Sequence, residues 1–169
     1  MAIIEPSVSE AEVGSLLRTN LVDIVLAVAA DAERWRPRVR HKLYWRHFER
    51  LSCADDHELW LICWDVGQMT LLHDHGPSSG AFVVVEGALL EDHGQAGTGR
   101  LAQRRVSRGR PRSFGPDYVH NLSNPGPGLA TSIHAYAPRL TTMTYYAVLP
   151  GGAVPVRTQP VESPEPAAP

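Results

Sequence analysis

The sequence lacks the features that mark secreted, membrane-bound and nucleic-acid-binding proteins. Its 169 residues include only two cysteines, which excludes a disulfide framework and favours a reduced protein, with Cys63 in an apolar run expected to be a buried thiol. No apolar run reaches the roughly 18 residues that a membrane span needs, and the first residues lack the basic start and apolar core of a secretory signal. The formal net charge of −2 provides no basic field for nucleic acid. We therefore expect a cytoplasmic protein, monomeric or weakly homo-oligomeric, without a membrane or nucleic-acid partner.

The first part of the chain has the periodicity of helices. Apolar residues recur at helical spacing from about residue 8 to 36, which predicts one or two helices there. Ser9 followed by Glu12 three residues later matches a capping box. Pro37 is expected to end the helical segment, because proline cannot continue a helix.

From about Lys42 onward, short runs rich in β-branched and aromatic residues alternate with glycine, proline, asparagine and aspartate. Many short strands with turn residues between them and no helices predict an all-β sandwich or barrel. The Glu86–Gly87 pair between two of the runs indicates a tight hairpin. The runs expected to be strands are 42–50, 58–65, 69–74, 81–86, 88–93, 100–107, 111–114, 118–123, 130–137 and 142–148.

The end of the chain differs in composition from the rest. Residues 151–169 include five prolines and almost no large apolar side chain. Such a segment cannot bury enough apolar surface to offset the entropy of ordering it. We therefore expect one domain over residues 1–150, followed by a disordered tail.

Two of the eight histidines are placed to act together. His73 and His75 lie in an extended run, and residues i and i+2 of a strand point to the same face. Their imidazoles can therefore share one metal ion, whereas Asp74 points the other way and is not expected to be a ligand. A polar sheet face with two solvated histidines is the alternative. Three other histidines have no such pattern and are expected to be ordinary surface or core residues: His41, His57 and His93.

The spacing around the two histidines resembles the first of two motifs that the cupin barrels carry. Gly67 is followed by five residues and then by His73-x-His75, and Gly87 stands where the motif ends. The acid of this motif would fall at Gly80, which has no side chain to offer as a ligand.

The second cupin motif is matched further along the chain. Gly109 stands at the expected distance before His120, and Asn124 follows that histidine after three residues. The turn between them is permuted, since Gly115–Pro116–Asp117 replaces the usual Pro-x-Gly. Two motifs with matching spacings imply an all-β cupin fold, a double-stranded β-helix or jelly-roll barrel, with helices at its N-terminus.

The acid missing at position 80 leaves three histidines as the expected metal ligands: His73, His75 and His120. Three neutral nitrogens with open coordination positions suit iron, copper, nickel or zinc. Without a carboxylate ligand the centre keeps its two positive charges, which favours an anionic ligand, above all a soft thiolate.

Within the cupins, the sequence resembles the thiol dioxygenases, and among them most closely cysteine dioxygenase. The resemblance covers residues 42–148. It rests on YWR at 44–46, on the histidine-bearing run that ends in VVVEGALLE, on HNLSN at 120–124 and on TSIHAYAP at 131–138.

The resemblance assigns roles to individual residues. The three histidines would hold Fe(II), and Arg46 would pair with the substrate carboxylate, with Tyr44 contributing at the same end. A planar guanidinium binds a carboxylate through two parallel hydrogen bonds, which suits arginine to this task.

The resemblance also implies an outer shell behind the metal. Ser132, His134 and Tyr136 alternate along one strand and would form a relay on one face, with the tyrosine hydroxyl pointing toward oxygen or the substrate carboxylate. Animal members carry a cysteine crosslinked to this tyrosine at the position of Gly80. Bacterial members commonly have glycine there, so this chain resembles the type with an uncrosslinked Tyr136.

The function implied is that of a non-haem Fe(II) dioxygenase that oxidises L-cysteine with O2 to cysteine sulfinic acid. Relatives that act on 3-mercaptopropionate typically have glutamine at the position of Arg46, although Arg139 could serve a different carboxylate. A biosynthetic cysteine derivative as substrate and a non-enzymatic cupin that binds a metal or a small ligand are further alternatives. Three aromatic residues are expected to fill the core: Trp60, Trp64 and Phe82.

Overall fold

The computed structural model describes residues 10–98, 100–150 and 152–161. The chain begins with α1 (Glu10–Ala30), α2 (Ala32–Trp35) and the 3-10 helix η1 (Arg36–Arg38). The strands that follow are β1 (His47–Cys53), β2 (Glu58–Trp64), β3 (Ser79–Glu86), β4 (Ala88–Gln95), β5 (Ala102–Ser107), β6 (Arg112–Phe114), β7 (Tyr118–Ser123), β8 (Ala130–Ala137), β9 (Thr142–Leu149) and β10 (Gly152–Pro160).

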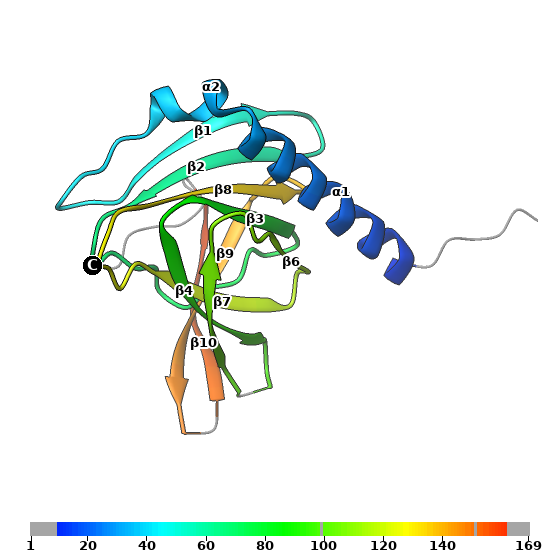
Figure 1. Ribbon diagram of the computed structural model, residues 1–169. Coiled ribbons are helices and arrows are strands. Elements are labelled where there is room, and N and C mark those ends of the chain that lie inside the picture. Colours follow the sequence, from blue (N-terminus) through cyan, green and yellow to red (C-terminus); the bar gives the residue numbers. More distant parts are fainter. Residues whose placement is uncertain (1–9, 99, 151, 162–169) are drawn as a thin grey trace, which may run out of the picture.

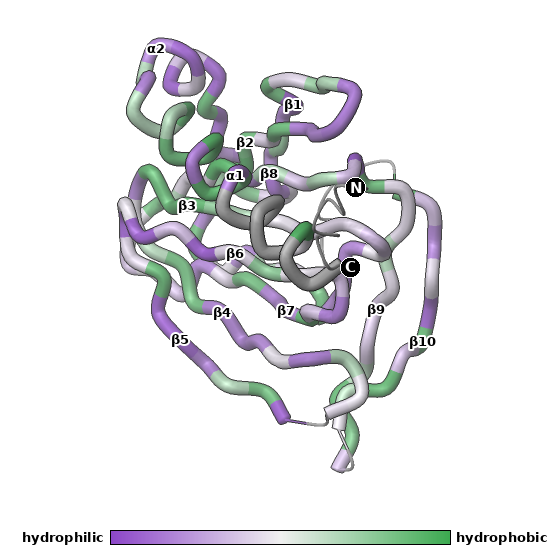
Figure 2. The backbone as a smooth tube through the Cα atoms, turned by 90° about the vertical axis from the view of Figure 1, so that its right-hand side faces the viewer, coloured by the Kyte–Doolittle hydropathy of each residue, from purple (hydrophilic) through white to green (hydrophobic). Residues whose placement is uncertain are grey.

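The strands form three antiparallel sheets in the part of the chain that the structure describes. The largest has the order β1-β2-β8-β3-β6, the second β5-β4-β7 and the third β10-β9 (Figure 1). In Figure 2, β5 and β10 lie at opposite sides of the view, with β7 and β9 between them. The predicted all-β class with N-terminal helices is confirmed.

The central strands of the five-stranded sheet are buried on both faces because both faces are covered. β2, β3 and β8 are nearly continuous apolar runs in which almost every residue is buried, as expected for strands without a solvent face. One face packs against α1, which crosses the sheet in Figure 1, and the other turns into the barrel. Side chains alternate between them, so that Val83 and Val85 meet the helix while Phe82 and Val84 point inward.

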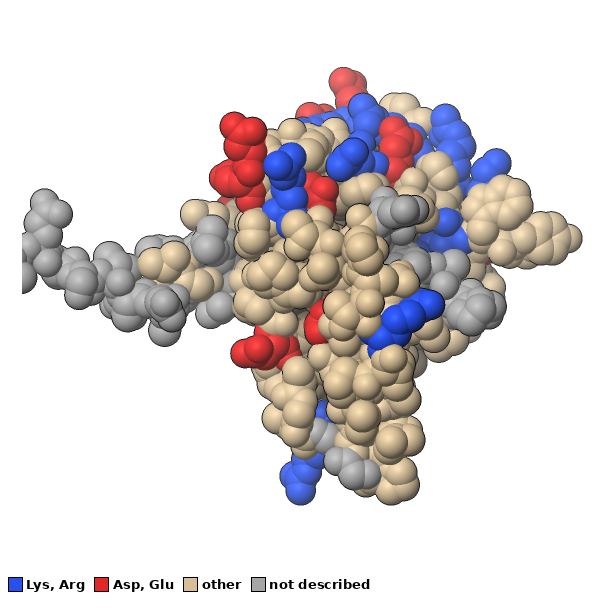
Figure 3. Space-filling model, turned by 180° about the vertical axis from the view of Figure 1, so that it is seen from behind, with Lys and Arg blue, Asp and Glu red and all other residues tan. Residues whose placement is uncertain are grey.

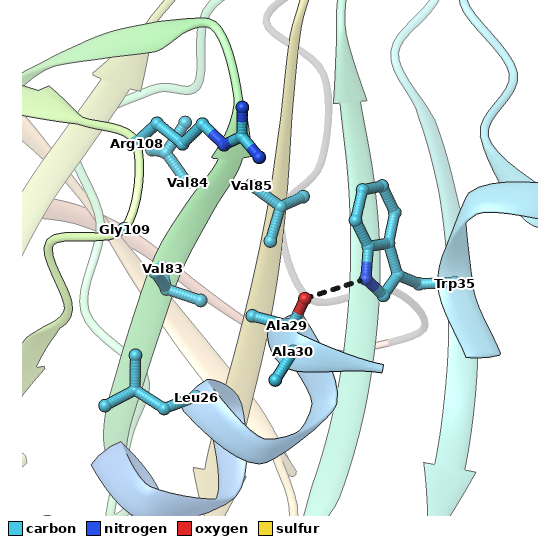
Figure 4. Close-up of a pocket in the computed structure, with 9 residues that line it drawn as sticks. All are labelled: Leu26, Ala29, Ala30, Trp35, Val83, Val84, Val85, Arg108 and Gly109. Carbon is cyan, nitrogen blue, oxygen red and sulfur yellow. Dashed lines mark hydrogen bonds between the residues drawn. The ribbon is translucent and has the colours of Figure 1, made fainter. Parts of the chain in front are cut away.

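A shallow cavity of about 260 Å³ lies where the end of α1 meets β3. Figure 4 shows it on the helix side of the sheet, with the Trp35 indole N–H donating to the Ala29 carbonyl at 3.3 Å. Arg108 is the one charged residue among those that line it. The sheet therefore separates this cavity from the inside of the barrel, which inward-facing residues such as Phe82 line.

Charged side chains are unevenly distributed over the surface. On the face in Figure 3, acidic and basic residues gather at the top, where α2 and β1 lie, while the lower part is mostly uncharged. Two arginines of this region are paired, since Arg36 lies 3.8 Å from Glu86 and Arg38 lies 3.1 Å from Glu49. Within the described residues, no helix has the length and apolarity of a membrane-crossing segment.

Within the described residues the predicted helical segment is present as α1 and α2, and Pro37 lies inside η1 rather than directly after a helix. Ser9 of the predicted capping box lies outside the described residues. Cys53 is exposed and Cys63 is buried, and both thiols are free, as expected.

Two predicted strands are wrong in extent. The run 42–50 is a strand only from His47 onward, because the preceding residues form a loop with exposed apolar side chains. The run 69–74 is extended but makes only isolated bridges, at Met69 and His73. It pairs with different strands on its two sides and so belongs to no single ladder.

The predicted hairpin at Glu86–Gly87 is also wrong. β3 and β4 do not pair with each other and belong to different sheets. Gly87 has a φ of +71°, and a Cβ there would overlap the backbone carbonyl of Leu129. This glycine therefore makes a sharp corner where the chain leaves one sheet for the next.

The C-terminal segment is ordered further than its composition predicts. Residues Gly152–Pro160 form β10, which pairs with β9, whereas the expected tail was disordered from residue 151. Among the described residues β10 has one neighbouring strand, so Pro155 and Pro160 can lie at this edge without breaking a ladder on the other side. The rest of the predicted tail lies outside the described residues.

Candidate metal centre

The segment with the two neighbouring histidines is held between β7 and β9. On one side, His73 and His120 exchange both backbone hydrogen bonds at 2.9 Å. On the other side, the Tyr146 N–H donates to the Leu72 carbonyl at 2.9 Å. These bonds place the first metal-ligand candidate directly beside the third, although many residues separate them in the sequence.

Asp74 fixes the turn between the two histidines. Its Oδ1 accepts hydrogen bonds from the backbone N–H groups of Gly76 and Thr144, each at 3.0 Å, and its Oδ2 accepts one from the Tyr146 hydroxyl at 2.8 Å. The carboxylate is used by these donors and points away from the histidine cluster, as the strand alternation predicts.

His73, His75 and His120 converge inside the barrel. The candidate ligand nitrogens all lie within 4.8 Å of one another, and each of the three side chains is fully buried. The structure therefore brings together the three residues that the sequence predicts as ligands. It also matches the prediction that no carboxylate joins them, because the described His, Cys, Asp and Glu residues form only this group of three.

The lowered pKa values of two of the three histidines suit metal binding. Burial, together with the charge of neighbouring His120, lowers the pKa of His73 to about 3. Burial and the adjacent histidines also lower the pKa of His75 well below its usual value. Neutral imidazoles are the form that binds metals. Among the described residues, the Nε2 atoms of His73 and His120 and both ring nitrogens of His75 have no hydrogen-bond partner, so a divalent transition metal fits this donor set.

Two of the three imidazoles are oriented by hydrogen bonds behind them. The Nδ1–H of His73 donates to the Leu71 carbonyl at 2.7 Å, and the Nδ1–H of His120 donates to the Glu91 carboxylate at 2.9 Å. Both bonds leave Nε2 as the lone-pair nitrogen that faces the cluster. His75 instead stacks against rings, with centroids 4.8 Å from Phe114 and 5.0 Å from Tyr136.

Glu91 is a site residue that the sequence interpretation missed. It is fully buried, and besides His120 it accepts hydrogen bonds from the Tyr118 hydroxyl and from Arg104 Nε, both at 2.7 Å. These partners overcome the cost of burial and lower the pKa of Glu91 to about 2. A signal was present in the alternation of β4, where Leu89 and Glu91 occupy inward positions and an inward acid needs a partner.

Replacing Glu91 by glutamine is expected to weaken metal binding by about 10- to 100-fold, since removing an outer-shell partner typically has this effect. The amide oxygen still accepts the hydrogen bond from His120. It lacks the negative charge that makes the imidazole a stronger metal ligand. The measurement is Co(II) affinity by competition with a chelator. Asp92→Asn is the matched control, because Asp92 is the next residue and bonds Gln103 outside the cluster. Equal affinity of Glu91→Gln and the wild type would contradict the role.

Metal-free protein is expected to lose stability as the pH falls from 7 to 5. The pKa of His73 is about 3 in the folded state against 6.5 for a free side chain, so the unfolded chain binds more protons over this range. At pH 5 this residue alone lowers the free energy of unfolding by about 2 kcal/mol. Glu91 acts only below this window, because its ordinary pKa is 4.5. Urea unfolding of metal-free protein at both pH values checks this, and equal stability would contradict it.

Arg46 is close enough to the histidines for its charge to act on them. Its side chain is 4% exposed, its guanidinium lies 4.7 Å from the ring centroid of Trp64, and Nη1 donates to the Met69 carbonyl at 3.0 Å. Its positive charge contributes to lowering the pKa values of both His73 and His134. Arg46 is therefore a buried cation whose charge acts on the histidines.

The two other residues considered for the carboxylate end do not join the cluster. Tyr44 is 86% exposed in the loop before β1, so the prediction that it contributes to the site is not supported. Its loop is turned outward even though Arg46, two residues later, is turned in. Arg139 is exposed, and its Nη1 donates to the thiol sulfur of Cys53 at 3.4 Å.

The residues predicted as a relay do contact one another along β8. His134 Nε2 lies 2.8 Å from Ser132 Oγ, and His134 Nδ1 lies 3.3 Å from the Tyr136 hydroxyl. All three are fully buried, and burial lowers the pKa of His134 well below its usual value. The imidazole is therefore neutral, and it joins the serine to the tyrosine.

Trp64 has more than the core-filling role expected of it. Its indole N–H donates to Ser132 Oγ at 2.8 Å while its ring lies under Arg46. Because the indole only donates, the Ser132 hydroxyl can donate its own hydrogen bond to His134 Nε2, which favours the tautomer with Nδ1–H facing Tyr136. One side chain thus supports both the relay and the cation. Trp60 and Phe82 are buried in the inner core, as expected.

Solved structures with a similar fold were found. TT1209 from Thermus thermophilus has a TM-score of 0.54 at 15% identity, over 62% of this chain and 93% of that chain. A cupin superfamily protein from Desulfitobacterium hafniense has a TM-score of 0.51 at 8% identity, over 62% of this chain and 87% of that chain. At such identities the likeness concerns the fold alone, and it confirms the predicted cupin barrel.

A family model described as cysteine dioxygenase type I matches residues 8–148. The match includes the three histidines, Arg46 and the whole of β8. Together, the family and the three-histidine group indicate a cupin thiol dioxygenase, a metal-binding oxidoreductase that acts on a small molecule and O2. This chain belongs to the cysteine dioxygenase type I family.

Proposed function

We propose that the protein is an Fe(II)-dependent dioxygenase that converts free L-cysteine and O2 to cysteine sulfinic acid. The observation that carries the proposal is a buried, all-histidine cluster, in which the pKa values of His73 and His75 are lowered, with a buried arginine close by. The reaction adds both oxygen atoms to sulfur, which supplies all four electrons, so no separate reductant is needed. A cytoplasmic location and a monomeric or weakly oligomeric state remain predictions.

His73, His75 and His120 would hold the iron, which when bound supplies the redox centre and the template that bring O2 to a thiolate. Neutral ligands leave the charge of the dication uncompensated in a buried site. The site therefore favours an anionic sulfur over a neutral ligand. Gly80 adds no acid that would compete for this charge.

Arg46 supports an amino acid as substrate. A guanidinium pairs with a carboxylate through two parallel hydrogen bonds, and the Trp64 ring and the Met69 carbonyl limit how Arg46 can move. A thiol with a carboxylate at the right distance would be held at both ends. This positioning removes much of the entropic cost of reaction.

The relay on β8 would hold the Tyr136 hydroxyl in place and allow a proton to move to or from its oxygen. His134 is neutral and joins Tyr136 to Ser132, whose oxygen also accepts from Trp64. Gly80 pairs with Tyr136 across β3 and β8, so the neighbouring strand offers no sulfur for a crosslink. We propose that this tyrosine works uncrosslinked.

A panel of thiols tests the proposal directly. The Fe(II)-loaded protein is expected to consume O2 with L-cysteine at a kcat/KM at least 10-fold above that for cysteamine, which lacks the carboxylate, or 3-mercaptopropionate, which lacks the amine. A preference for 3-mercaptopropionate would show that the substrate is a thiol acid other than L-cysteine. Metal binding without oxygen uptake for any thiol would indicate a non-enzymatic cupin.

A further inference from the structure

His75 is oriented differently from the other two candidate ligands. His73 and His120 are held through hydrogen bonds to Leu71 and Glu91, whereas the ring nitrogens of His75 have no hydrogen-bond partner among the described residues. Its direction therefore depends on the rings packed against it. The ring of Phe114 lies nearly parallel to it, at 4.8 Å and 27°.

Phe114 itself has little room to move. It is 4% exposed at the end of β6, and its ring also stacks on Tyr118, with centroids 5.1 Å apart and planes 13° apart. Tyr118 in turn is held by hydrogen bonds to Glu91 and from Arg104. A displaced Phe114 ring would have to push one of these partners or His75.

The space that Phe114 occupies is the space above Gly80. The two residues are paired across β3 and β6. A Cβ built on Gly80 would overlap the outer carbons of the Phe114 ring. Any side chain at position 80 would therefore press on a ring that cannot yield without shifting His75 or Tyr118.

We propose that Phe114 is the positioning residue for His75, and that position 80 must be glycine because the Phe114 ring fills its side-chain volume. The ring takes the place that an acidic ligand would need, so Gly80 and Phe114 together keep the centre all-histidine. The inference rests on the proposed function only in that these histidines bind a metal.

A purely structural role predicts something different. An aromatic ring that covers a cross-strand glycine stabilises a sheet, and losing it would lower stability without changing the geometry of a metal bound elsewhere. A positioning role instead predicts a change in metal affinity and in the spectrum of the bound metal. The two roles are therefore separated by measurements on the metal rather than by stability alone.

The experiment uses the full chain, stripped of metal and titrated with Co(II), whose visible absorption reports ligand geometry. The variants are Phe114→Leu, Gly80→Ala and their combination. Val106→Ala is the control, because Val106 is fully buried in the same core cluster and contributes no ring or ligand to the centre. Melting temperatures of all variants without metal give the structural effect.

Phe114→Leu and Gly80→Ala are each expected to weaken Co(II) binding by about 10-fold or more and to shift its absorption bands. The double variant should bind no more weakly than Phe114→Leu, because leucine leaves room for the added methyl group. Val106→Ala should lower the melting temperature and leave the Co(II) spectrum unchanged. If Phe114→Leu does not fold, Phe114→Met replaces it.

Two failures are distinguishable. Wild-type protein that binds no Co(II) would overturn the metal centre and the proposed function with it. Wild-type protein that binds Co(II), with Gly80→Ala or the Phe114 variant binding equally well and with the same spectrum, would overturn the positioning role alone.

Discussion

Replacing His120 by alanine is expected to abolish both iron binding and oxygen uptake. The substitution removes one of the three candidate ligands. We expect the two that remain to bind a divalent metal too weakly to retain it. It also leaves Glu91 buried with one donor fewer. Because the metal supplies the redox chemistry, loss of metal and loss of activity should coincide.

The measurement is metal content after anaerobic loading with Fe(II), followed by oxygen uptake with L-cysteine. His57→Ala is the matched control, since His57 bonds Asp56 at the surface and takes no part in the cluster. The control should load and turn over like the wild type. Full oxygen uptake by His120→Ala would show that this histidine is not a ligand.

Replacing Arg46 by glutamine is expected to raise the KM for L-cysteine and lower kcat/KM by about 100-fold, because breaking a buried charge pair removes roughly 2–5 kcal/mol of binding. Glutamine keeps a donor for the Met69 carbonyl but lacks the second parallel hydrogen bond and the charge. Cysteamine has no carboxylate, so its smaller kcat/KM should change little. This difference between substrates separates a binding role from a general disturbance of the site.

A second arginine offers the matched control. Arg50 also lies over a tryptophan, with 5.3 Å to the ring centroid of Trp60, and it sits 3.6 Å from Glu58 with 53% of its side chain exposed. Arg50→Gln should leave the KM for cysteine unchanged. An unchanged KM in Arg46→Gln would place the carboxylate contact elsewhere.

The three-histidine cluster could be predicted from sequence because each of its members belongs to a local pattern. Strand alternation puts His73 and His75 on one side, and the spacing of the second motif selects His120. The relay on β8 follows from the resemblance of TSIHAYAP to the family's motif, with strand alternation placing its three residues on one face. These predictions depend on strand periodicity and on motifs shared with a known family, both of which the order of residues contains.

The residues that support the ligands could not be found in this way. Glu91 and Phe114 reach the site from β4 and β6, and their roles depend on pairings between strands that are distant in the sequence. Trp64 has the sequence context of an ordinary core residue. Its two roles depend on contacts with Ser132 and Arg46, which are distant in the sequence. Tyr44 lies two residues before Arg46 in the sequence, yet it faces solvent while Arg46 turns inward.

The main errors in the fold have a related cause. Glu86–Gly87 has the composition of a hairpin, but the same glycine conformation also allows a corner between two sheets. The proline content of the C-terminal segment suggested disorder, yet an edge strand tolerates proline where no further strand must pair. Local composition limits the backbone angles, while the tertiary partners decide between the structures that those angles permit.

The central claim is that the three-histidine centre adds both atoms of O2 to the sulfur of L-cysteine. The most direct test is a single reaction of the Fe(II)-loaded protein with L-cysteine under 18O2, with the product examined by mass spectrometry. We predict cysteine sulfinic acid that carries two 18O atoms, with one O2 consumed for each cysteine. Cystine as the product, or a sulfinic acid with a single 18O atom, would contradict the claim.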